Sequence, residues 1–226
     1  MTPRTKAQNE EIRNRRIAEI IQAAADVYLD KGMLLEIRDV ARLAGLGYGT
    51  VYHYYKNKLD LLHDLLWQAL ERSAATVDRL IHESQTNFRG RLPFGVEISG
   101  VMTMARTQEI EHKLWPALVA DLLKTWAEDH TAYLVFQLGN EDYRQLPEEQ
   151  ALPLIKAYRE RIVIPLSHLV ELGESRAAPV ISDLGAEART RMLLSALTGC
   201  TMLPLRRGTL SAEAEGISSF LCAGLA

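Results

Sequence analysis

Apolar residues recur at helical spacing through the first third of the chain and predict four helices there. An apolar stripe predicts a helix over 17–31, which Gly32 ends. The same spacing predicts a helix of about two turns from Ile37 to Ala44, and a third from Gly47 to Tyr54. A longer apolar face between residues 59 and 81 predicts a fourth helix, with Asn57 as its N-cap and Asp60 three residues further on.

The remaining chain shows the same periodicity. It predicts a loop over 85–93 and helices near 94–106, 109–138 with a break at Pro116, 147–174, 184–203 and 211–224. Glycine-rich strand-to-helix turns and β-hairpin signals are absent. The expected fold is therefore all-α, with a small domain over 1–60 and a larger helical bundle over 61–226. The fourth helix is long enough to connect the two.

A glycine separates the second and third predicted helices. Gly45 directly follows the apolar face that ends at Ala44, and glycine readily adopts the left-handed conformation that ends a helix and turns the chain. Leu46 is then placed to pack into the angle between the two helices. This arrangement predicts a helix-turn-helix.

The third predicted helix is rich in hydrogen-bonding and flat side chains. Tyr48, Thr50, Tyr52, His53 and Tyr54 are of the kinds that suit DNA phosphates and base edges. Gly49 lies inside this helix at a cost of about 1 kcal/mol relative to alanine. We expect packing of Val51 and contact with DNA to hold the helix in shape.

These residues carry a resemblance to a known family. DVARLAG at 39–45 and GTVYHYYKNKLDLL at 49–62 make residues 12–66 resemble the amino-terminal domain of the TetR family of bacterial transcriptional repressors. Two features depart from the family pattern. The loop between Gly32 and Arg38 is one residue shorter than usual, and Glu36 and Gly47 stand where capping Ser or Thr is common.

The resemblance and the residue types together suggest the DNA contacts. Lys58, Thr50, Tyr52 and Tyr54 are candidates for phosphates, whereas Arg38, Tyr48 and His53 are candidates for base edges, with Gly49 between them. Tyr52 has the alternative role of packing the small core of the head. The net charge of −3 divides into +2 over residues 1–60 and −5 over 61–226, so the more basic end is the helix-turn-helix.

The resemblance implies a small-molecule effector held between helices of the second domain. Its candidate lining is aromatic or apolar with few polar groups: Met102, Arg106, His112, Trp115, Trp126, Tyr133, Tyr158 and Arg161. Each would serve equally well as ordinary core. Pro165 removes the hydrogen-bond partner of the Arg161 carbonyl and predicts a kink. The expected effector is largely apolar.

The last two predicted helices, 186–205 and 211–225, are apolar on more than one side. They are therefore buried either within one subunit or between subunits. The resemblance implies a homodimer that pairs these helices from each copy, with Leu197 and Phe220 in the contact. It further implies that the two heads bind a palindromic double-stranded DNA operator and that the effector releases them.

Other kinds of chemistry find little support in the sequence. Glu109 and His112 have the spacing of one half of a di-iron ligand set, but there is no second copy, and no catalytic motif is present. No cofactor, metal or membrane span is expected, and a cytoplasmic location is expected because residues 1–16 lack the apolar core of a signal peptide. Two alternatives remain: a ligand-binding or enzymatic bundle that keeps a DNA-binding head, and an architectural DNA binder without an effector.

Overall fold

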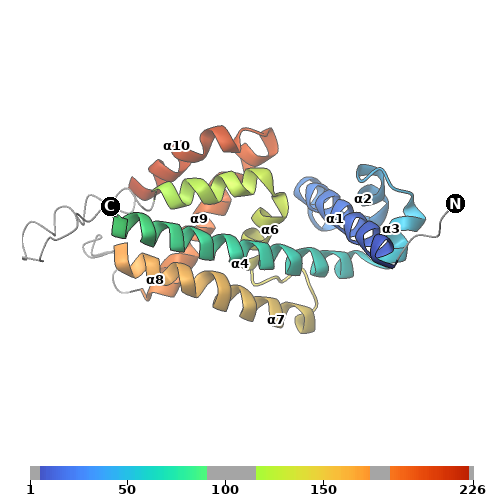
Figure 1. Cartoon of the computed structure of the whole chain (residues 1–226), viewed down its shortest axis with the longest axis horizontal. Coiled ribbons are helices and arrows are strands. Elements are labelled where there is room, and N and C mark those ends of the chain that lie inside the picture. The colour runs from blue at the N-terminus through green and yellow to red at the C-terminus, as the bar shows by residue number, and fades with distance from the viewer. Residues whose placement is uncertain (1–5, 91–115, 174–183, 224–226) are drawn as a thin grey trace, which may run out of the picture.

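The computed structural model describes residues 6–90, 116–173 and 184–223, and every regular element in these ranges is helical (Figure 1). The predicted helix at 94–106 lies outside the described residues. None of the described helices is long and apolar enough to cross a membrane. The all-α fold is confirmed for the described part of the chain.

The head consists of α1 (Lys6–Lys31), the 3-10 turn η1 (Gly32–Leu34), α2 (Ile37–Leu43) and α3 (Tyr48–Tyr54). Both predicted glycine turns are confirmed, since Gly32 and Gly45 have φ angles of 56° and 65°. Leu46 donates its N–H to the Ala41 carbonyl at 2.9 Å and packs against the core. The helix-turn-helix therefore forms through local glycine chemistry and a shared apolar centre.

The helix α4 (Lys58–Gly90) joins the two domains. Asn57 Oδ1 accepts hydrogen bonds from the backbone N–H groups of Leu59 and Asp60, each at 2.9 Å, and its Nδ2 donates to the Asp60 carboxylate at 2.6 Å. The predicted N-cap is thus confirmed. At 1.5 Å per residue α4 is about 50 Å long. It runs from the head along the full length of the second domain (Figure 1).

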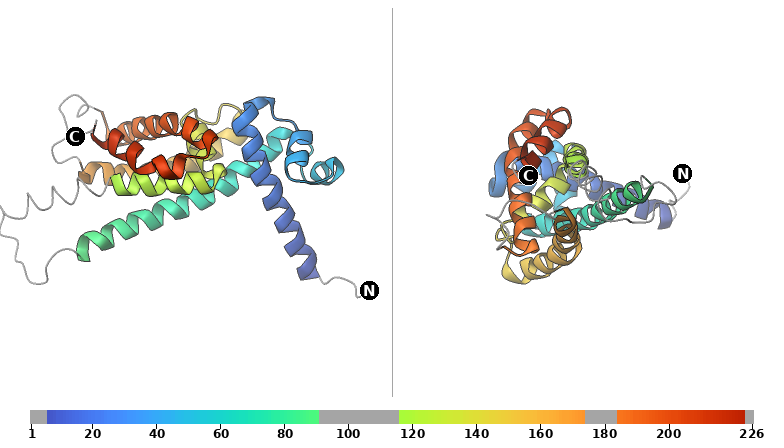
Figure 2. Two further views of the ribbon diagram at one scale, coloured as in Figure 1. Left: turned by 90° about the horizontal axis from the view of Figure 1, so that it is seen from above. Right: turned by 90° about the vertical axis from the view of Figure 1, so that its left-hand side faces the viewer.

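The second domain packs the helical residues 116–128 and five labelled elements around the later turns of α4. These are α6 (His130–Gly139), α7 (Glu148–Tyr158), α8 (Ile164–Gly173), α9 (Ala186–Arg207) and α10 (Leu210–Ala223). Figure 2 shows α9 and α10 together on the side of the bundle opposite α4.

The predicted helix 109–138 has an interruption that the sequence did not predict. It falls at Asp129, where the carboxylate accepts the Thr131 N–H at 2.9 Å and caps α6. The predicted break at Pro116 borders residues outside the described part and stays a prediction. The apolar period continues across Asp129, so periodicity did not reveal the interruption. A capping carboxylate ended one helix and began the next.

The expected irregularity near Pro165 takes the form of a π-helical turn, η2 (Arg159–Val163), between α7 and α8. The Ile164 N–H donates to the Arg159 carbonyl, five residues back. Because Pro165 has no N–H to give to the Arg161 carbonyl, the wider turn lies where the α-helical pattern is interrupted.

Candidate nucleic-acid interface

An open groove lies on the head where α2, α3 and α4 begin. It is lined by Leu35, Glu36, Ile37, Arg38, Tyr48 and Lys58. Three of the predicted DNA contacts, Arg38, Tyr48 and Lys58, therefore share one surface. The beginnings of three helices bring them together although they are ten or more residues apart in the sequence.

The outer face of α3 is exposed, as a DNA-reading helix requires. Tyr48 and Tyr52 are 55% and 42% exposed, and their rings stack with centroids 5.6 Å apart. Lys56 Nζ lies 4.7 Å from the centre of the Tyr52 ring. Tyr52 thus presents its ring to solvent, and the alternative role as head core is wrong.

Other predicted contacts on α3 differ in exposure. Gly49, Thr50 and His53 are exposed, and a Cβ added at Gly49 would meet no atom within 4 Å. Tyr54 is half-buried and packs against the core. A side chain at position 49 would therefore meet no protein atom, so the space beside Gly49 is open.

Two residues at α3, Val51 and Tyr55, pack into the core of the head. Val51 is fully buried, and Tyr55 at the C-cap donates its hydroxyl hydrogen to Asp64. Burial, reinforced by Asp64, raises the pKa of Tyr55 well above its ordinary value. The role of Tyr55 was not foreseen, because Tyr52, Tyr54 and Tyr55 are alike in sequence and only packing distinguishes them.

Arg38 is not free in the groove. Its Nε lies 2.6 Å from the Glu36 carboxylate, and both side chains are exposed. Glu36 occupies the N-cap position of α2 but makes no capping hydrogen bond. The residue that replaces the usual capping Ser or Thr therefore pairs with the candidate base-reading arginine.

Lys58 connects the groove to the turn after α1. Its Nζ donates to the Met33 carbonyl at 2.5 Å. Because an ammonium group carries three N–H donors, this contact leaves two for a phosphate.

A charge cluster behind the groove holds α1 to α2. Asp39 accepts hydrogen bonds from Lys31 Nζ at 2.8 Å and Arg42 Nη2 at 2.7 Å. The hydrogen bond from Lys31 is the main reason that the pKa of the Asp39 carboxyl lies below its ordinary value. The Asp39 carboxylate therefore anchors the end of α1 to α2.

The predicted effector lining is only partly described. Trp126, Tyr133 and Tyr158 are buried and come together around Phe136, with Trp126 and Phe136 ring centroids 4.9 Å apart and Phe136 and Tyr158 centroids 6.0 Å apart. Burial raises the pKa of Tyr133 to about 12. Met102, Arg106, His112 and Trp115 lie outside the described residues.

Two polar atoms in this aromatic group stand out. Trp126 Nε1 and the Tyr158 hydroxyl are buried without a hydrogen-bond partner among the described residues. A buried unpartnered donor of this kind costs about 1–3 kcal/mol.

Arg161, by contrast, lies at the surface. It donates two hydrogen bonds to the Glu71 carboxylate, one of them at 2.8 Å, and so ties η2 to α4 rather than facing the aromatic group.

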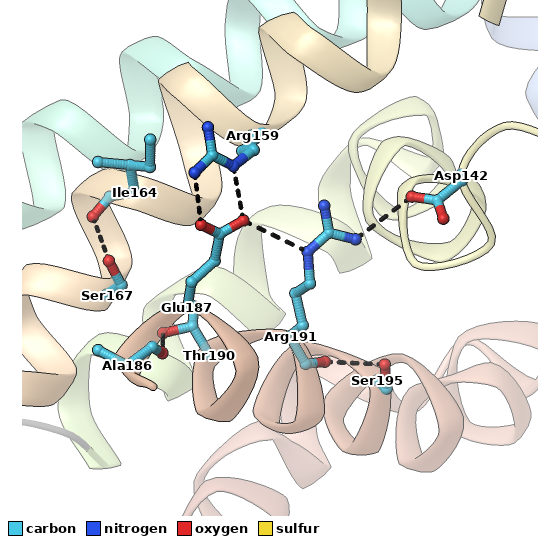
Figure 3. Close-up of polar contacts among 9 residues, drawn as sticks. All are labelled: Asp142, Arg159, Ile164, Ser167, Ala186, Glu187, Thr190, Arg191 and Ser195. Carbon is cyan, nitrogen blue, oxygen red and sulfur yellow. Dashed lines mark hydrogen bonds and ion pairs between the residues drawn. The ribbon is translucent and has the colours of Figure 1, made fainter. Parts of the chain in front are cut away.

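A second ion-pair network holds the start of α9 (Figure 3). Arg159 of η2 donates two hydrogen bonds of 2.8 Å to Glu187, and Arg191 connects Glu187 to Asp142 in the loop after α6. The hydrogen bonds from Arg159 hold the pKa of the Glu187 carboxyl below its ordinary value. Among the described residues, no group of three His, Cys, Asp or Glu is placed to hold a metal ion.

An exposed third helix beside a groove that bears Arg38 and Lys58 is the arrangement expected of a helix-turn-helix DNA-binding domain. Residues 20–65 match the sequence model described as bacterial regulatory proteins, tetR family. The head of the chain therefore contains the DNA-binding domain of this family, which indicates a DNA-binding regulator rather than an enzyme. A comparison with curated proteins gave no match.

Several solved structures are similar over nearly the whole chain. The fatty acid degradation regulator FadR from Bacillus halodurans is 21% identical with a TM-score of 0.54, covering 93% of this chain and 96% of that one. The TetR-family regulator PfmR from Thermus thermophilus is 18% identical with a TM-score of 0.55, over 91% and 96%. FadR from Bacillus subtilis, in complex with stearoyl-CoA, is 19% identical with a TM-score of 0.52, over 92% and 99%. These likenesses show the fold.

Proposed function

We propose that the protein is a homodimeric repressor whose two heads bind a palindromic operator and are released by a small, largely apolar effector. The exposed Tyr48–Tyr52 face of α3, over the groove that holds Arg38 and Lys58, is the observation that carries this proposal. Recognition helices of this class enter the major groove, and paired heads bind half-sites about one DNA turn apart.

The outer face of α9 and α10 supports the dimer. Met192, Met202, Leu203 and Phe220 are all exposed large apolar residues, and Phe220 is 75% exposed. Met192, Ala196, Gly199 and Leu203 follow one another at helical spacing, and all are exposed. An exposed apolar face of this kind on a soluble helix favours a protein contact.

One face of α9 is buried within the subunit, and we propose that the opposite face is buried between subunits. Leu197 is only 1% exposed within one subunit, so the expectation that it lies in the dimer contact is wrong. Leu194 and Leu205 are likewise buried in the subunit core. The proposed interface therefore uses the opposite face of α9 together with Phe220.

The aromatic group in the second domain supports an apolar effector. Trp126 Nε1 and the Tyr158 hydroxyl have no hydrogen-bond partner among the described residues, and both rings pack against Phe136. An apolar molecule with one or two hydrogen-bond acceptors would complement them. The stearoyl-CoA in the complex of the Bacillus subtilis regulator is one molecule with a long apolar part, and it is a reasonable first probe.

Selection of DNA from a random duplex library by the purified protein tests this proposal. We expect enrichment of an inverted repeat, and sedimentation of the selected complex should give at least two protein chains per duplex. Enrichment of a single unrepeated half-site, or a monomer at micromolar concentration, would contradict the homodimer. Operator release by stearoyl-CoA then tests the effector separately.

A further inference from the structure

The helix α1 extends well beyond the head that it belongs to. Residues 6–16 are all exposed, and the first fully buried residue of α1 is Ile20. The family match also begins at residue 20. We call residues 6–16 the arm. The compact head does not require it, because its side chains contribute nothing to the buried core.

One face of α1 is polar along the arm and apolar along the rest of the helix, and we call its polar part the polar line. At 100° per residue, Lys6, Asn9 and Arg13 lie in line with the buried Ile20 and Ala24. From Ile20 onward this line packs into the head. An apolar continuation would favour a protein partner, whereas lysine, asparagine and arginine are among the side chains that bind DNA phosphates.

Among the described residues, nothing neutralises the two cations on this line. Lys6 and Arg13 form no ion pair with any residue in 6–90, 116–173 or 184–223. The neighbouring Arg15 and Arg16 both pair with Glu19, at 3.1 and 2.8 Å. The arm also has two carboxylates: Glu11 projects from the opposite side of the helix to Arg13, and Glu10 flanks the line.

The last turn of the arm lies near the end of α3, and the arm projects from the head (Figure 2). The positive charge of Arg13 reaches the hydroxyl of Tyr55 at the end of α3, where it partly offsets the rise in the Tyr55 pKa that burial and Asp64 cause. Figure 1 and the left view of Figure 2 both place the amino-terminal end of α1 at the same end of the long axis as α3. The polar line therefore starts near the carboxyl end of α3 and extends outward at the end of the molecule that carries the candidate DNA interface.

We propose that the arm is an additional contact to the DNA backbone, in which Lys6, Asn9 and Arg13 bind phosphates flanking the half-site read by α3. This inference rests on the proposed function, because it needs a head docked on duplex DNA. At 1.5 Å per residue the arm is about 16 Å long, comparable to about five base-pair steps. Each subunit would thereby extend its footprint without reading bases.

The test compares two single substitutions that remove the same charge. Arg13→Gln removes a cation from the line, whereas Arg15→Gln removes one from the opposite side, where Arg15 is 81% exposed. The double variant Lys6→Gln/Arg13→Gln enlarges the effect. Affinity is measured by fluorescence anisotropy at several salt concentrations, on the library-selected duplex and on an unrelated duplex of equal length. Hydroxyl-radical footprinting then maps the protected phosphates.

We expect Arg13→Gln and the double variant to bind both duplexes more weakly by a similar factor. The slope of log K against log salt should fall in magnitude by about 0.9 for each phosphate that the variant no longer binds. The footprint should shorten at both flanks, and Arg15→Gln should match the wild type. Arg13→Lys keeps the charge and should restore most of the affinity. Unchanged helicity and thermal stability would show that each variant folds.

Three results would overturn the inference. The first is that the double variant has the same affinity and salt slope as Arg15→Gln. The arm would then be a solvated helix that does not contact DNA. The second is a weakening confined to the selected duplex, which would mean base reading. The third is an unchanged footprint. Failure of the proposed function looks different: the wild type itself would not prefer the selected duplex to the unrelated one.

Discussion

His130 Nδ1 lies 2.6 Å from Asp26 Oδ1, and this contact joins the first turn of α6 to α1. It is reinforced nearby, because Arg72 of α4 hydrogen-bonds both Asp129 and Thr131 at the start of α6. A further contact joins α9 to the end of α1, where Arg206 donates a hydrogen bond to the Leu29 carbonyl. The head is thus attached to the second domain by polar contacts in addition to the shared helix α4.

The first prediction concerns this junction. Asp26→Asn and His130→Gln should each change operator affinity, because the head would no longer be held in one orientation relative to α4. For a half-exposed pair we expect a coupling of about 0.2–1 kcal/mol in a double-mutant cycle on operator binding. Additive effects of the two substitutions would show that the contact does not orient the head.

Local features of this fold were predictable, whereas contacts between distant segments were not. The Gly45 turn and the Asn57 cap depend on neighbouring residues, so residue type and spacing were sufficient. Asp26 and His130 are 104 positions apart, and no periodic pattern links them. The first turns of α1 were missed for another reason: they have no apolar stripe, and the helix continues from its packed half into solvent.

The candidate site was likewise only partly predictable from the sequence. Residue types alone singled out Arg38, Tyr48 and Lys58, which line one groove, and their contact with DNA stays a prediction. The pairing of Arg38 with Glu36 depended on side-chain geometry that a sequence does not contain. The buried aromatic residues were foreseen as a group, but Arg161 was not distinguishable from them until its partner Glu71 was seen.

A second prediction concerns Arg38 and its partner. Arg38→Ala should lose preference for the selected operator by about 1–3 kcal/mol if the guanidinium binds guanine. Glu36→Gln should strengthen binding to all DNA, because it frees Arg38 and removes a carboxylate from the groove. Competition between selected and unrelated duplexes measures both effects. Retained operator preference in Arg38→Ala would contradict base reading by this residue.

A third prediction concerns the outer face of α9 and α10. Phe220→Arg should yield a folded monomer, because the residue is exposed within the subunit and a charge there opposes burial between subunits. Leu197→Arg is the contrasting variant: its site lies in the subunit core, so it should lower the melting temperature and cause aggregation. Sedimentation and circular dichroism distinguish these results. A dimeric Phe220→Arg variant would place the interface elsewhere.

A fourth prediction follows from the lowered pKa of Asp39. Because its folded-state pKa is below the unfolded value of about 3.9, the carboxylate stabilises the fold above that value, and this stability is lost as pH falls through the folded-state pKa. Asp39→Asn should therefore melt at a lower temperature than the wild type at pH 7. The difference should shrink as the pH is lowered below about 4. A difference that stays constant with pH would mean that ionisation of Asp39 is not its source.

The last prediction concerns the Tyr158 hydroxyl, which has no hydrogen-bond partner among the described residues. The Tyr158 ring packs so closely on Gly139 that a Cβ there would lie 2.8 Å from it, which fixes the ring and the position of its hydroxyl. Removing an unpartnered buried hydroxyl while keeping the ring should cost little, so Tyr158→Phe should unfold in urea at the same or a higher midpoint than the wild type.

If that hydroxyl instead binds the polar group of an effector, the same variant should need more stearoyl-CoA to release the operator, with unchanged ligand-free affinity. Tyr133→Phe is the matched control, because the Tyr133 hydroxyl already donates to the Thr198 carbonyl at 3.2 Å and its removal should lower stability. A lower urea midpoint for Tyr158→Phe would show that its hydroxyl has a partner in solution, and the polar end of the proposed effector site would then have to be sought elsewhere.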